Sequence, residues 1–92
     1  MGVTRVINIR NGEPYDVLID RRTIYGNPFR IGRDGNRDEV CDKHEKYLQE
    51  RVKKDLYFRM KVLELIGKVM GCWCKPLRCH GDNYVKYLEG ME

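Results

Sequence analysis

The sequence predicts a small α/β fold in which helices pack on a mixed sheet of about three strands. Two segments near the N-terminus, residues 4–10 and 16–20, have the alternation and aliphatic content of half-buried strands. Residues 38–66 carry apolar side chains at helical spacing, and a third strand-like segment over 68–74 precedes a last amphipathic stretch. A chain of 92 residues has room for one domain, so the order β-β-loop-α-α-β-α spans residues 1–92 as a single unit.

The first two strands are expected to form a hairpin. Residues 4–10 alternate around Val6, Ile7 and Ile9, and the Asn-Gly-Glu-Pro sequence at 11–14 is typical of a turn before the second strand at 16–20. Residues 21–37 then contain three glycines, one proline and two asparagines, which favours a long loop. A short strand at 29–31 is the regular piece we expect within that loop.

The middle of the chain is expected to be helical. A helix should begin near Asp38, with Asp34 or Asn36 as its cap, and Asp38 would sit in the first turn where the helix dipole favours acids. Its buried face combines Val40, His44, Tyr47, Leu48 and Val52. A second helical stretch over 55–66 would turn Leu56, Met60, Leu63 and Ile66 inward and stop at Gly67. The pattern leaves open whether the two stretches form one long helix or a kinked pair.

The last third of the chain predicts a buried strand over 68–74 and a final helix. That helix should start between Cys79 and Asp82 and run to about Glu89, with Tyr84, Val85 and Leu88 on its inner face. Cys41 and His44 are expected to be core residues of the first long helix.

The composition argues against disordered, membrane and secreted proteins. Hydrophobic residues make up 41% of the chain and charged residues 35%, as in folded globular proteins. No apolar run reaches the length of a membrane span, and the first ten residues lack the apolar core of an export signal. We therefore expect a cytoplasmic protein without a membrane partner.

The cysteines and a histidine cluster near the C-terminus. Cys72, Cys74, Cys79 and His80 lie within nine residues and offer three thiolates and an imidazole, which are the ligand types of a tetrahedral zinc site. Alternatively, Cys79 is a reactive thiol at a helix N-terminus, with His80 as its acid/base partner and Asp82 orienting that histidine or capping the helix. A third interpretation makes Cys72 and Cys74 small core residues of the strand.

The loop at 21–37 is the second candidate site. The net charge is +4, and the arginines of the first 37 residues supply most of the excess. Arginine suits bidentate contacts with phosphate, while Tyr25 and Phe29 could stack on a base. The candidate ligand-binding residues are Arg21, Arg22, Asn27, Arg30, Arg33 and Arg37. Alternatively, Phe29 and Ile31 anchor a purely structural loop and the arginines lie in water.

The residues of both candidate sites resemble a known family. The segments 8–40 and 71–88, with the motifs Gly26-Asn27-Pro28-Phe29, Cys72-Trp73-Cys74 and Cys79-His80-Gly81-Asp82, resemble short phage, bacterial and archaeal proteins known as a domain of unknown function. The resemblance covers nearly the whole chain and implies an association with phages or mobile elements, and hence the host cytoplasm for a phage-encoded protein. It also implies that Cys72, Cys74, Cys79, His80 and Asp82 act together.

Three functions follow as hypotheses. The first is a binding or regulatory module for a nucleotide, a nucleic acid or another phosphorylated ligand, stabilised by zinc if the cysteines are structural. The second is a nucleotide-processing enzyme with Cys79 as nucleophile. The third is a phage-encoded inhibitor that binds a host protein.

Overall fold

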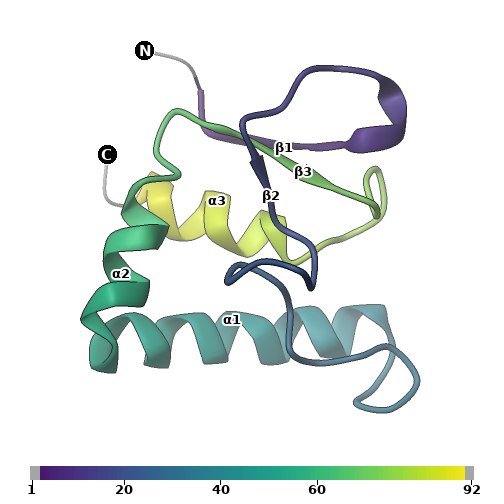
Figure 1. The fold of residues 1–92 in the computed structure, drawn as a ribbon. Coiled ribbons are helices and arrows are strands. Elements are labelled where there is room, and N and C mark those ends of the chain that lie inside the picture. The colour runs from purple at the N-terminus through teal and green to yellow at the C-terminus, as the bar shows by residue number, and fades with distance from the viewer. Residues whose placement is uncertain (1–2, 91–92) are drawn as a thin grey trace.

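The computed structural model describes residues 3–90 and confirms a small α/β fold with the expected order of elements (Figure 1). The strands are β1 (Arg5–Asn8), β2 (Val17–Leu18) and β3 (Val69–Cys72), and the helices are α1 (Arg37–Lys54), α2 (Leu56–Leu63) and α3 (Gly81–Glu89), with a 3-10 turn η1 (Ile9–Asn11) after β1. In Figure 1, α3 lies between the sheet and α1, and α2 stands across the end of α1. Within residues 3–90, no helix is long and apolar enough to cross a membrane.

The sheet differs from the prediction in its topology. Its order is β1-β3-β2, and both pairs are parallel, so the expected hairpin and the mixed sheet are wrong. Asn8 ends β1 by accepting the Arg10 N–H at 2.9 Å, and Gly12 at φ 78° turns the chain away from an antiparallel return. β3 is the central strand of the sheet. Its Met70, Gly71 and Cys72 are buried, as expected for a strand that is covered on both faces.

The first helix begins as the sequence indicates. Asn36 is the cap of α1: its side chain accepts the Glu39 N–H, and the Glu39 side chain accepts the Asn36 N–H, each at 2.9 Å. In the preceding loop, the predicted strand at 29–31 is wrong. Phe29 lies in a bend, and a turn over residues 31–33 follows, closed by the Asp34 N–H, which donates to the Arg30 carbonyl at 2.8 Å.

The second helix turns a different face inward from the one predicted. Phe58 and Val62 are fully buried, as is Leu65 just after the helix, whereas Leu56, Met60 and Leu63 are 60%, 59% and 38% exposed. Of the four residues predicted to face inward, Ile66 packs against the core. The chain breaks at Asp55, which ends α1 and caps α2 by accepting the Phe58 N–H at 3.0 Å. Because both faces of α2 are apolar, its periodicity does not select the buried one.

The core lies between the helices and the sheet. Phe58, Leu48, Met70, Tyr84 and Leu88 form its centre together with aliphatic residues of α1 and α2. The predictions for Cys41 and His44 are confirmed, since both are buried. Gly67 turns the chain at φ 76° between α2 and β3.

Candidate ligand-binding cavity

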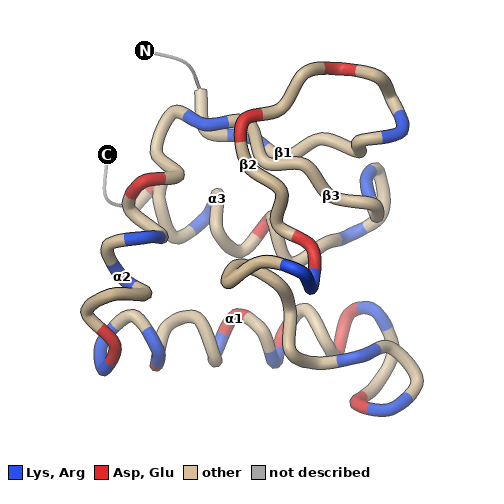
Figure 2. Tube along the Cα trace, viewed as in Figure 1, with Lys and Arg blue, Asp and Glu red and all other residues tan. Residues whose placement is uncertain are grey.

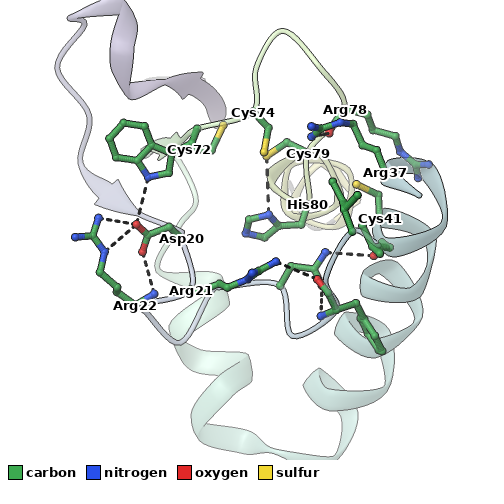
Figure 3. Close-up of a pocket in the computed structure, with 15 residues that line it drawn as sticks. Asp20, Arg21, Arg22, Arg37, Cys41, Cys72, Cys74, Arg78, Cys79 and His80 are labelled. Carbon is green, nitrogen blue, oxygen red and sulfur yellow. Dashed lines mark hydrogen bonds and ion pairs between the residues drawn. The ribbon is translucent and has the colours of Figure 1, made fainter. Parts of the chain in front are cut away.

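A cavity of about 320 Å³, called the main cavity here, opens at the carboxyl ends of β2 and β3 (Figure 3). Parallel sheets place ligands at this edge, where the strands end and the following loops and helices begin. Four segments line the main cavity: residues 20–22 after β2, residues 27–31 of the loop, the first turns of α1, and residues 72–80 between β3 and α3. The two candidate sites of the sequence therefore meet in one place.

The predicted ligand-binding residues divide into three groups. Arg21, Arg22, Asn27 and Arg37 line the main cavity. Arg30 lines a second cavity next to it. Arg33 lines neither, because its guanidinium donates to Asp34 at 2.9 Å and to the Pro28 carbonyl at 3.2 Å.

Sequence reasoning missed two residues of the wall, Asp20 and Trp73. The Trp73 indole N–H donates to Asp20 Oδ2 at 3.3 Å, and both side chains line the main cavity. Asp20 comes just after β2 and Trp73 just after β3. A parallel sheet brings the residues that follow its strands to one edge, so the positions of Asp20 and Trp73 in the sequence could have identified them. The predicted hairpin placed them at different edges.

Two arginines of the main cavity are neutralised by carboxylates. Arg22 pairs with Asp20 at 2.7 Å, and the hydrogen bond from Arg22 lowers the pKa of Asp20 to about 2. Arg78 pairs with Asp42 at 2.8 Å and with Asp38 at 3.2 Å. These contacts fix the rim of the cavity and tie it to α1.

The other two arginines contact backbone carbonyls. Arg21 donates to the Phe29 carbonyl at 3.3 Å, and Arg37 donates to the Arg78 carbonyl at 3.2 Å. Within residues 3–90 neither guanidinium has a carboxylate partner. Their positive charges are therefore available to an anion that enters the main cavity.

All four cysteines line the main cavity, and their thiols are free. The Gly81 N–H donates to Cys79 Sγ at 3.2 Å, yet contact with Cys72 and burial raise the pKa of Cys79 well above its usual range. The hydrogen bond from Cys79, joined by the backbone N–H groups of Lys75 and Cys74, lowers the pKa of Cys72 to about 6. The nucleophile role predicted for Cys79 stays a prediction, and a raised pKa argues against it.

A hydrogen bond to the backbone fixes the orientation of the His80 ring. Its Nε2 lies 2.7 Å from the Ile19 carbonyl, which can only accept, so Nε2 carries the proton and Nδ1 faces Cys79 Sγ at 4.0 Å. Burial lowers the pKa of His80. Asp82 does not orient this ring: it accepts the Cys79 backbone N–H at 3.2 Å and pairs with Lys75 at 2.8 Å. It therefore fixes the turn before α3 and does not act as the helix cap, which is His80 without a side-chain hydrogen bond.

The predicted zinc site receives no geometric support. Among residues 3–90, no three His, Cys, Asp or Glu side chains are arranged to hold a metal ion. Coordination by Cys72, Cys74, Cys79 and His80 stays a prediction, and a metal-content measurement on the purified protein tests it.

Comparisons with known proteins confirm the family resemblance. The family described as "Domain of unknown function (DUF4326)" matches residues 6–90. The chain is 35% identical over 79 residues to an uncharacterized 12.4 kDa protein from the nrdA-td intergenic region of Enterobacteria phage T4, covering 85% of the chain and 70% of that protein. It is 42% identical over 74 residues to an uncharacterized protein of Acanthamoeba polyphaga mimivirus, covering 72% of the chain and 53% of that protein. No solved structure gives a significant match.

Proposed function

The chain belongs to the DUF4326 family, and we propose that it is a binding module whose main cavity takes a phosphorylated ligand of the nucleotide type. The observation that carries the proposal is the pair Arg21 and Arg37 on one cavity, each without a carboxylate partner within residues 3–90. Arginine forks bind phosphate by paired, charge-assisted hydrogen bonds.

The rest of the wall fits the remainder of a nucleotide. Trp73 and Ile31 line the main cavity and are 44% and 53% exposed, so they present apolar surface at its mouth. The Arg10 guanidinium lies over the Trp73 ring, 5.6 Å from its centre, and the exposed remainder of the indole offers a stacking surface to a base of any kind. The cavity therefore joins a cationic rim with flat apolar surface, which is the combination that a nucleotide requires.

The test uses the chain's own fluorescence, since Trp73 is the one tryptophan of the sequence. Thymidine 5′-monophosphate titrated at low salt should change the Trp73 emission saturably, and thymidine, which lacks the phosphate, should bind far more weakly. Arg21→Gln and Arg37→Gln should each weaken binding roughly tenfold, the loss of one charge-assisted hydrogen bond.

Arg59→Gln is the matched control. Arg59 is exposed on α2 and lines neither the main nor the second cavity, so its loss should leave the affinity unchanged. The proposal fails if the monophosphate leaves the Trp73 emission unaltered at low salt, or if Arg59→Gln weakens binding as much as Arg21→Gln.

The exposed apolar side chains of α2 favour a second candidate function, which is binding of a host protein. Leu56, Tyr57 and Met60 are 60%, 64% and 59% exposed on one short helix. Apolar groups gathered on a surface are a feature of protein interaction sites. A Leu56→Glu/Met60→Glu variant should lose any specific host partner, whereas Arg21→Gln should retain it; equal capture by both variants would discount the candidate.

A further inference from the structure

A second cavity of about 460 Å³ adjoins the main cavity, because Arg21 and Asn27 line both. Its other walls come from residues 23–30 of the loop and from α1, which supplies Tyr47 and Arg51. Figure 2 shows basic positions along the segment that joins β2 to α1. Residues of this segment line both cavities.

The second cavity is also cationic. Among residues 3–90, three arginines line it, Arg21, Arg30 and Arg51, and no acidic residue does. Arg51 is engaged by Asp55 at 3.3 Å, and it packs over the Phe58 ring at 4.2 Å. The Arg30 guanidinium, by contrast, has no hydrogen-bond or ion-pair partner within residues 3–90, although its backbone is fixed by Asp34 at 2.8 Å. Arg30 lines the second cavity and not the main one, so it adds to the second cavity a cation without a carboxylate partner within residues 3–90.

We propose that the two cavities bind successive nucleotides of a single strand of nucleic acid, with Arg21 and Arg37 contacting the phosphate held at the main cavity and Arg30 contacting the next phosphate, at the second cavity. The inference rests on the proposed function of the main cavity and names its ligand. A mononucleotide would fill the main cavity and leave Arg30 without a phosphate. A strand carries a phosphate at each nucleotide and can therefore contact the arginines of both cavities.

A single strand fits better than a duplex for a physical reason. Bases enter cavities only when they are unpaired, and they then pack on aromatic side chains while arginines follow the backbone. Phe29 lines the main cavity and Tyr47 the second, and their rings meet edge to face at 6.3 Å. Each cavity therefore offers aromatic surface beside its arginines: Phe29 and Trp73 in the main cavity and Tyr47 in the second.

The test compares a strand with its own monomer. An oligothymidylate of about eight nucleotides, within the usual site size of single-strand proteins, is titrated against thymidine 5′-monophosphate with Trp73 emission as the readout. The oligonucleotide should bind at least tenfold more tightly than the monomer. Its affinity should fall with added salt, with a slope of about 0.7 per phosphate contacted.

Arg30→Gln separates the inference from the proposed function. It should weaken oligothymidylate binding about tenfold and reduce the salt slope by about 0.7, while leaving binding of the monophosphate unchanged. Arg59→Gln should leave both affinities unchanged. Equal affinity for strand and monomer, or an Arg30→Gln variant that binds the strand like the original chain, would overturn the inference and leave the proposed function standing. Binding of neither probe would overturn both.

Discussion

His44 should make the protein lose stability in mild acid. The ring is fully buried, Asn83 donates to its Nδ1 at 3.0 Å, and its Nε2 has no partner within residues 3–90. Burial, with a further contribution from His80, lowers the pKa of His44 from 6.5 to about 3. A protonated His44 would hold an unpaired charge in the core, 5.1 Å from the His80 ring centre.

The sign and size follow from proton linkage. Because the folded pKa lies below the unfolded one, the unfolded chain binds the proton first. The stabilisation is therefore complete above the unfolded pKa and is lost as pH falls from 6.5 towards 3. Between neutral pH and about pH 4.5 this amounts to about 3 kcal/mol of unfolding free energy. The pKa values of Asp20, Asp34 and Asp55 are lowered as well, and most of the stability that depends on these three carboxylates is lost at lower pH.

Urea unfolding of the original chain and of His44→Gln at neutral pH and at about pH 4.5 measures the effect. The original chain should lose about 3 kcal/mol more than the variant does over this interval. Comparing the pH-dependent loss of the two proteins cancels any stability that the substitution itself costs at neutral pH. His80 is present in both proteins, so its own contribution cancels as well. An equal loss in the two proteins would refute the assignment of the pH dependence to His44.

Three stability predictions concern the fold, each read by chemical or thermal unfolding. Phe58→Ala should lower the free energy of unfolding by about 3–5 kcal/mol and Leu56→Ala by less than about 0.5 kcal/mol, because α2 buries Phe58 and exposes Leu56. Comparable losses in the two variants would mean that the wrong face of α2 has been assigned to the core. Asn36→Ala should cost about 1 kcal/mol through loss of the cap of α1, and no loss would argue against that cap. Gly81→Ala should destabilise by about 1–3 kcal/mol, since its Cβ would lie 2.8 Å from atoms of the neighbouring core. The Cβ of Gly90→Ala would meet its nearest atom at 3.4 Å, so that variant should be tolerated. Equal melting temperatures of the two variants would contradict this packing.

Most elements could be predicted from local pattern, but their pairing could not. The segments at 4–10, 16–20 and 68–74 all contain strands, and the cap at Asn36 follows from its side chain and from Glu39 three residues on. The hairpin was wrong because an Asn-Gly turn signal describes a reversal of the chain without saying which strand lies beside which. That choice depended on β3, whose burial on both faces placed it in the centre.

The candidate site was predicted in two parts that the sequence could not join. The arginine loop and the Cys/His segment lie about 50 residues apart in the chain, and a parallel sheet is what brings them to one edge. Which arginines are available was also beyond sequence reasoning. Arg22 and Arg21 are neighbours of the same type, yet Arg22 is paired with Asp20 while Arg21 has no carboxylate partner within residues 3–90.

The most direct test of the central claim is an NMR titration of the ¹⁵N-labelled chain with thymidine 5′-monophosphate, with thymidine as the matched ligand. If the main cavity binds a phosphorylated ligand, the Trp73 indole signal and the side-chain signals of Arg21 and Arg37 should shift saturably with the monophosphate and far less with thymidine. Unmoved signals at these three side chains, or shifts confined to α2, would contradict the account.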